Sequence, residues 1–209
     1  MMKVDLHTHS VYSGGSDTPA ELMRKAKDAG LSAVALTDYC SLEGLEEAAA
    51  AAAELGLEFV PGVELPGRLS RYETELRLLG FFFDPDYAPL RALIESAKTE
   101  TPTVGQTASL IREAGGLVAM ADPRACGISG MALDGFMQNV RCCGVEFVEV
   151  LYPGYSSEES QAWLDTAKEW SMDPIGGSGC GLRGSSAVIG EPEVDYEVYA
   201  WLRECKAQL

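Results

Sequence analysis

Short apolar segments alternate with segments of helical periodicity along the whole chain, and this alternation constrains the fold more than any other feature. Seven apolar segments read as strands, most of them rich in β-branched or aromatic residues, at 4–6, 33–36, 59–60, 76–83, 117–121, 145–151 and 174–176. Helices are expected at 18–30, 41–56, 89–98, 104–114, 132–142, 157–170 and 195–206. The alternation predicts a parallel sheet covered by helices. Right-handed crossovers then lead to an open doubly wound sheet or to a closed barrel.

One expected helix begins with a specific capping signal. Thr18 suits the N-cap, Pro19 the first helical position, and Glu21 the third position, where its side chain can bond back to the cap. Gly30 suits the end of the same helix. The sequence therefore predicts a well-defined helix soon after the first strand.

Polar side chains stand at or just after the ends of the expected strands. They are His7, His9, Asp38, Glu64, Asp122 and Ser178. In doubly wound sheets and in barrels alike, ligands bind at the carboxyl ends of the strands. The sequence therefore predicts one functional site that gathers these residues at one end of the sheet.

The chain has only two histidines, and they lie two residues apart, at His7 and His9. On an extended strand the side-chain period is two, so both rings are expected on one face. Two imidazoles on one face at a strand end supply half of a metal site. The alternative is an ordinary pair of surface or core histidines, because a chain with two histidines cannot build a three-histidine site.

The charge balance restricts the ligands and partners of such a site. The chain has 16 Lys and Arg residues against 32 Asp and Glu residues, a net charge of −16 with a pI near 4.4. Such a surface repels phosphate backbones and anionic membranes, so we expect no nucleic acid and no membrane as partner. A small phosphorylated or anionic ligand remains open where a metal or focused arginines reverse the sign locally. A protein partner also remains open.

Apolar runs and cysteines indicate the compartment. No apolar run reaches the roughly 18 residues that a membrane span needs, and Asp5 stands where a secretory signal would be apolar. The cysteines are Cys40, Cys126, Cys142, Cys143, Cys180 and Cys205. They form no C-x-x-C pair, and their spacing fits neither a zinc ribbon nor a disulfide framework. We therefore expect reduced thiols and a cytoplasmic protein.

Five short motifs in the first third of the chain resemble one known family. They are Asp5-Leu6-His7-Thr8-His9-Ser10, Thr18-Pro19-Ala20-Glu21-Leu22, Ala29-Gly30-Leu31, Ala35-Leu36-Thr37-Asp38 and Pro61-Gly62-Val63-Glu64-Leu65. In order and spacing they resemble the PHP (polymerase and histidinol phosphatase) family, and a looser similarity continues to Gly177-Ser178. The resemblance implies a single domain over 1–209, an α/β fold of the distorted (β/α)7 TIM-like barrel type, and no separate cap domain. It also implies two or three Zn, Mn or Fe ions and hydrolysis of phosphoesters by a metal-bound hydroxide.

Several positions depart from the family pattern. His7, His9 and Glu64 stand where the family has metal ligands. Other usual ligands, Asp or His in the family, are replaced here by Gly14, Tyr39, Arg77, Asp122, Gly179 and Gly181. The resemblance therefore implies a depleted site that holds at most one divalent metal, Zn, Mn or Fe, or none.

The replacements also suggest contacts for an anion. A guanidinium is permanently charged, so Arg77 repels a cation but can bind a phosphate or carboxylate through two hydrogen bonds. Asp122 is a weaker candidate for a metal ligand, and we favour a salt bridge between Asp122 and Arg77. Arg124 and Arg183 are further candidates for anion binding or plain surface arginines. The glycine-rich loop 176–184 either offers N–H groups to an anion or is a remnant of lost ligands.

Three functions remain open. The first is a PHP scaffold with a degenerate metal site, inactive or weakly active, that binds a small anionic or phosphorylated ligand. The second is a one-metal phosphoesterase that hydrolyses a small phosphate ester through metal-bound hydroxide. The third is a metal-free structural or protein-interaction domain. The loss of so many ligands favours the first function. Ligands supplied instead by Cys40 or Cys180 are a minor alternative, because neighbours of ligands on a strand point the other way.

Overall fold

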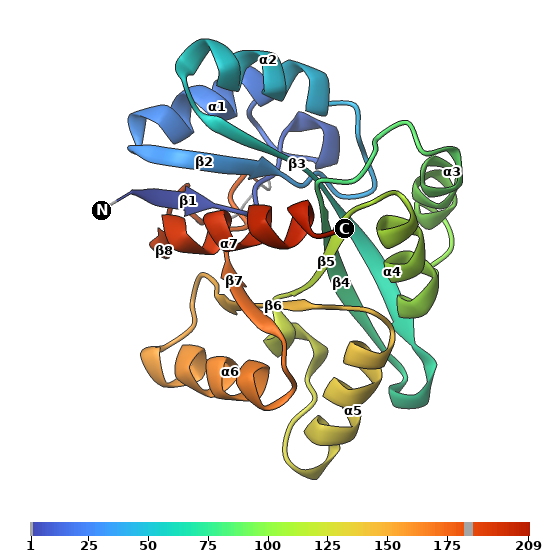
Figure 1. Cartoon of the computed structure of the whole chain (residues 1–209). Helices are drawn as coiled ribbons and strands as arrows, with labels where there is room; N and C mark the ends of the chain where they lie inside the picture. Colours follow the sequence, from blue (N-terminus) through green and yellow to red (C-terminus); the bar gives the residue numbers. More distant parts are fainter. Residues whose placement is uncertain (1, 182–185) are drawn as a thin grey trace.

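The computed structural model describes residues 2–181 and 186–209. Within them, a mixed sheet of eight strands in the order β7-β6-β5-β4-β3-β2-β1-β8 curves into a nearly closed barrel surrounded by helices (Figure 1). The strands are β1 (Lys3–Asp5), β2 (Leu31–Leu36), β3 (Glu58–Leu69), β4 (Thr74–Phe81), β5 (Leu117–Ala121), β6 (Phe147–Leu151), β7 (Asp173–Gly176) and β8 (Val194–Asp195). The predicted α/β class and TIM-like barrel are confirmed.

Two details of the barrel differ from seven parallel strands. β4 runs antiparallel to both of its neighbours, β3 and β5. Only residues 70–73, the 3-10 turn Ser70–Tyr72 and Glu73, separate β3 from β4. Such a short turn can join antiparallel strands, whereas parallel strands need a long crossover. The additional strand, β8, has two residues and pairs antiparallel with β1. A segment this short carries no periodicity from which it could be predicted.

The helices lie close to their expected positions. They are α1 (Pro19–Asp28), α2 (Leu45–Leu55), α3 (Ala88–Ala97), α4 (Val104–Glu113), α5 (Met131–Cys142), α6 (Ser157–Glu169) and α7 (Tyr196–Ala207). The capping signal is confirmed, because Thr18 Oγ1 accepts the Glu21 N–H at 3.2 Å and Glu21 accepts the Thr18 N–H at 2.9 Å. α2 begins at Leu45 rather than Ser41, because Ser41 Oγ accepts the Glu43 N–H in a turn. Among the described residues, no helix has the length and apolar character to cross a membrane.

The inside of the barrel is apolar and is closed at one end by α7. Side chains such as Leu79, Phe81 and Phe147 fill it, and Leu202 of α7 belongs to the same buried cluster. Tyrosine hydroxyls of α7 also donate to Glu58, the first residue of β3. Because α7 covers the amino-terminal end of the strands, the opposite end is left for a site.

The barrel closes between the ends of β1 and β7, and the carboxylate of Asp5 fastens this closure. Asp5 is buried and accepts the N–H groups of His7 at 3.2 Å, Ser178 at 2.9 Å and Gly190 at 2.8 Å. The His9 N–H donates to the Cys180 carbonyl at 2.7 Å. The segment after β7 is therefore packed against the strand end that carries both histidines.

This packing leaves no room for a side chain at Gly177. A Cβ there would lie 2.6 Å from the backbone nitrogen of His7 and closer still to its Cβ. We expect Gly177→Ala to lower the free energy of unfolding by about 1–3 kcal/mol, the usual cost of overpacking. Gly105→Ala, in α4, is the control. A Cβ at position 105 would meet only Cys143 Sγ, at 3.9 Å. Urea unfolding compares the two, and equal stability of Gly177→Ala and the wild type would contradict the expectation.

Candidate metal centre

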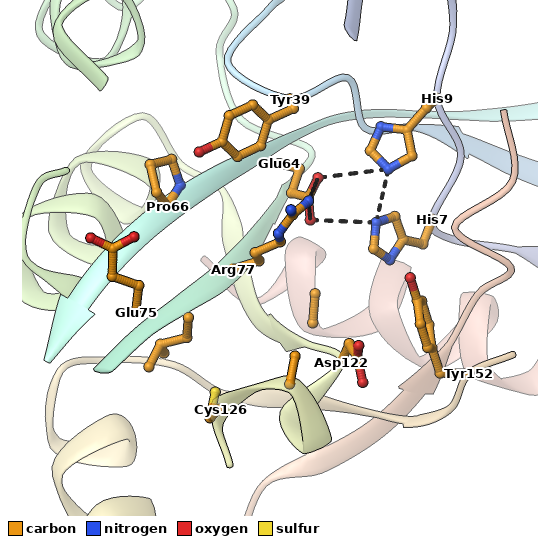
Figure 2. A pocket seen from close by; sticks show the side chains of 13 residues that line it. His7, His9, Tyr39, Glu64, Pro66, Glu75, Arg77, Asp122, Cys126 and Tyr152 are labelled. Carbon is orange, nitrogen blue, oxygen red and sulfur yellow. Dashed lines mark hydrogen bonds and ion pairs between the residues drawn. The ribbon is translucent and has the colours of Figure 1, made fainter. Parts of the chain in front are cut away.

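Three buried side chains converge just after β1 and in the middle of β3. His7 and His9 follow β1, whereas Glu64 lies within β3, which continues to Leu69 instead of ending near Glu64 as expected. The Nε2 atoms of His7 and His9 lie 3.1 Å apart, so the two rings share one face as expected. Glu64 Oε1 lies 3.7 Å from His7 Nε2, and Glu64 Oε2 lies 3.6 Å from His9 Nε2 (Figure 2). Within the described part of the chain, these three form the one group of His, Cys, Asp and Glu residues that could hold a metal ion. No cysteine belongs to this group.

The far nitrogens of both rings are also bonded. His7 Nδ1 lies 3.1 Å from Glu149 Oε1. His9 Nδ1 lies 3.2 Å from Ser13 Oγ, and Ser13 Oγ donates to Asp38 Oδ1 at 2.5 Å. Such partners fix the tautomer of a metal-binding histidine and aim its free nitrogen at the ion. Both Nε2 atoms therefore face Glu64, and Asp38 holds Ser10 and Ser13 through hydrogen bonds.

The two histidines differ sharply in basicity when no ion is present. Burial alone would lower the pKa of His7, but the carboxylates of Glu149, Glu64 and Asp5 outweigh it and raise the pKa to about 9. Burial lowers the pKa of His9 to about 2, and the charges of His7 and Arg77 add to this effect. The metal-free site therefore carries an imidazolium at His7 and a neutral ring at His9.

Metal binding should for this reason release a proton. An ion requires the neutral ring of His7, whose pKa is about 9. We expect one proton to be released per ion at pH 7, and the affinity to rise about tenfold per pH unit until the pH passes the pKa of His7. His9 adds no pH dependence to the zinc affinity near neutral pH, because its ring is already neutral there. Calorimetric titration with zinc in buffers of different ionisation enthalpy counts the protons, and zero release at pH 7 would contradict the expectation.

Arg77 lies against the carboxylate of this group. Its Nη1 is 3.3 Å from Glu64 Oε1 and 3.2 Å from Glu64 Oε2 (Figure 2). The favoured salt bridge between Arg77 and Asp122 is therefore wrong. Asp122 Oδ1 instead accepts the Tyr155 hydroxyl at 2.7 Å. Positions 77 and 122 are neighbours in the family pattern, but the Arg77 guanidinium lies nearer to Glu64, which is also more deeply buried than Asp122.

A pocket of about 330 Å³ opens above the three residues. Its charged groups are three carboxylates, the guanidinium of Arg77 and the imidazolium of His7. The lining consists of His7, His9, Tyr39, Glu64, Pro66, Glu75, Leu76, Arg77, Ala121, Asp122, Ala125, Cys126 and Tyr152. The Arg77 side chain is 56% exposed and lies over the Tyr39 ring. Burial raises the pKa of Tyr39 and of Tyr152, so both hydroxyls stay protonated and can donate to a ligand.

The other predicted anion contacts lie elsewhere. Arg124 donates to the Gly154 carbonyl at 3.0 Å and lies over the Tyr155 ring, and it does not line the pocket. Arg183 lies outside the described residues. The backbone N–H groups of Gly177, Ser178 and Cys180 donate to acceptors within the protein. These three N–H groups of the glycine-rich loop are therefore not free to bind an anion. Anion binding by Arg124 and Arg183 stays a prediction, as does Asp122 as a metal ligand.

Sequence reasoning missed the buried carboxylate behind His7. Glu149 lies within the apolar segment of β6, and its role depends on a residue 142 positions earlier in the chain. The available signal was a charged residue in the middle of a strand that otherwise reads as fully buried. A charge in such a place has a partner, but the sequence does not say which one.

Comparisons with known proteins identify the family and the fold of the chain. The family model for the PHP domain matches residues 5–141. The chain therefore belongs to the PHP domain family. In solved structures, it resembles a candidate metal-dependent phosphoesterase from Bifidobacterium adolescentis, with a TM-score of 0.86 and 18% identity over 98% of this chain and 96% of that one. It also resembles an amidohydrolase from Chromobacterium violaceum, solved with sulfate and no metal, with a TM-score of 0.84 and 20% identity over 95% and 96%.

Two curated relatives match the chain in part. A 5′-3′ exoribonuclease from Haemophilus influenzae is 36% identical over 97 residues, which is 46% of this chain and 34% of the relative. A 3′,5′-nucleoside bisphosphate phosphatase from Chromobacterium violaceum is 38% identical over 98 residues, which is 47% of this chain and 34% of the relative. The matched region thus spans about a third of the length of either relative.

Proposed function

We propose that this PHP domain binds one divalent metal and a small phosphorylated ligand, and that it is inactive or weakly active as a phosphoesterase. The contact between Arg77 and both oxygens of Glu64 carries the proposal. In a two-metal site this carboxylate would bridge the ions. A permanent positive charge on it opposes a second cation and can take the place of that cation's charge.

The residues present fit a single ion. Two imidazole nitrogens and one carboxylate are a common ligand set for zinc and also for non-haem iron, and they leave positions open for a ligand. His7, His9 and Glu64 would hold the ion, and Glu149 and Ser13 would keep the two rings turned toward it. When bound, the ion would supply positive charge that attracts and polarises a phosphate oxygen.

The pocket needs that charge in order to bind an anion. The carboxylates of Glu64, Glu75 and Asp122 line it and outnumber its two positive groups, the guanidinium of Arg77 and the imidazolium of His7. A phosphate would therefore meet net repulsion in the metal-free pocket. With an ion in place, the exposed guanidinium of Arg77 and the Tyr39 hydroxyl would bind the remaining phosphate oxygens. We expect anion binding to depend on metal.

Adenosine 3′,5′-bisphosphate is a suitable probe, because one relative is named for nucleoside 3′,5′-bisphosphates. We expect it to bind in the presence of zinc and not after chelation. Arg77→Ala should weaken binding roughly 10- to 100-fold, since a hydrogen bond to a charged group contributes about 1.5–3 kcal/mol. The matched control is Arg91→Ala, whose side chain is similarly exposed, at 57%, and pairs with Asp86 away from the pocket.

Two results would count against the proposal. Equal binding by Arg77→Ala and the wild type would remove Arg77 from the ligand site. Rapid hydrolysis of the probe, or of an aryl phosphate with added Mn or Zn, would favour the one-metal phosphoesterase. Loss of that activity in His9→Ala would then place the reaction in this pocket.

A further inference from the structure

Glu149 is a fully buried carboxylate in a strand that is otherwise apolar. It lies in β6 between Val148 and Val150, and its exposed fraction is 0%. A buried ionised group is strongly unfavourable unless hydrogen bonds and charges offset its desolvation. Glu149 does not line the pocket, so a ligand there would not touch it. Its partners within the protein must explain its place.

The two oxygens of Glu149 have two different partners. Oε1 faces Nδ1 of His7 at 3.1 Å, and Oε2 accepts the backbone N–H of Asp122 at 2.9 Å while lying 3.4 Å from the same Nδ1. His7 belongs to the candidate metal group, and Asp122 lines the same pocket. One side chain therefore touches both the metal group and the pocket wall.

Asp122 needs such support, because its backbone is in the left-handed region. It has φ 32° and ψ 67° at the point where β5 gives way to a 3-10 turn. Aspartate enters this region more often than most residues, but the conformation is uncommon and costs free energy that neighbouring hydrogen bonds can offset. Two hydrogen bonds hold Asp122 from two sides. Its backbone N–H donates to Glu149, and its Oδ1 accepts the Tyr155 hydroxyl.

We infer that Glu149 is a positioning residue that fixes two parts of the site at once, the ring of His7 with Nε2 toward Glu64 and the left-handed backbone of Asp122. The part of this inference that concerns metal affinity rests on the proposed function. The contacts of Glu149 with Nδ1 and with the Asp122 amide do not require an ion. Partners of this kind typically change metal affinity by about 10- to 100-fold.

Glu149→Gln tests the inference with almost no change in shape. A carboxylate accepts hydrogen bonds at both ends, whereas a carboxamide accepts at one end and donates at the other. The variant must therefore lose the bond from His7 Nδ1–H or the bond from the Asp122 N–H, or share its one oxygen between them with Nδ1 at the longer distance of 3.4 Å. We expect zinc affinity, measured above pH 9 where protons no longer compete for His7, to fall about 10- to 100-fold. Unchanged affinity would overturn the inference.

Glu146→Gln is the matched control. It makes the same chemical change just before β6, where the side chain pairs with Arg112 at 3.2 Å and lies outside the pocket. We expect wild-type zinc affinity from it. An equal loss in both variants would show a general effect of removing a glutamate and would overturn a specific role for Glu149.

A second readout needs only the wild-type protein. The chain has two histidines, so ring ¹⁵N spectra contain only two imidazoles. We expect a protonated Nδ1 on His7 and a downfield, slowly exchanging amide proton on Asp122, with at least one of these lost in Glu149→Gln. An unprotonated Nδ1 in the wild type would overturn the inference. Absence of bound zinc together with a protonated Nδ1 would overturn the proposed function alone and support the positioning role.

Discussion

Replacement of His9 by alanine is expected to weaken zinc binding by about 100-fold or more. A four-ligand structural zinc site binds with about 10–16 kcal/mol, so one ligand contributes roughly 3 kcal/mol, or about 100-fold in affinity. The candidate group has only three ligands, and the chain offers no other histidine to replace one. Competition with a chromophoric chelator measures the affinity. Zinc should also raise the melting temperature of the wild type and not that of the variant.

Cys126→Ala is the control for this loss. Cys126 lines the same pocket and is buried, but it does not belong to the metal group. Its replacement should leave zinc affinity unchanged. Tight zinc binding in His9→Ala, or a loss in Cys126→Ala as large as in His9→Ala, would show that the ion is held by other residues.

The double change Arg77→His and Asp122→His is expected to admit a second ion. It removes the guanidinium that lies 3.2 Å from Glu64 and adds two imidazoles on the same side of the pocket. Histidine is among the residues that tolerate the left-handed backbone found at position 122. We expect two equivalents of metal. Hydrolysis of an aryl phosphate should rise about 100-fold or more, the range in which one charge-stabilising group changes kcat.

The pair of changes Arg77→Ala and Asp122→Ala separates the two effects. It removes the same charges but adds no ligand, so it should still bind one equivalent. A second equivalent in this alanine variant would mean that charge alone had kept the ion out. A single equivalent in the histidine variant would show that Arg77 is not what excludes the second ion.

The local features of this chain could be predicted from its sequence. The capping box at Thr18 depends on residues three positions apart, and the shared face of His7 and His9 depends on a two-residue period. Glu64 was found through its motif, and its position beside the histidines follows because β1 and β3 both pair parallel with β2 in the same sheet. These features need only short-range geometry or the general architecture.

The pairings that depend on long-range packing could not be predicted. The antiparallel direction of β4 follows from a short turn after an unusually long β3. Arg77 contacts Glu64 because Pro66 stands opposite Arg77 in this antiparallel pair, which brings position 64 near it. A parallel β4 lacks the register that brings Arg77 near Glu64, so the sequence alone favoured Asp122 as the partner of Arg77. The contact between Glu149 and His7 likewise depends on the closed barrel.

The number of metal ions bound by the wild type tests the central proposal most directly. Native mass spectrometry and plasma mass spectrometry can count them in protein purified without a chelator or a polyhistidine tag, before and after incubation with excess Zn or Mn. We predict one equivalent, held by His7, His9 and Glu64 and lost in His9→Ala. Two or three equivalents would contradict the exclusion of further ions by Arg77, and none after incubation would contradict a metal site in this barrel.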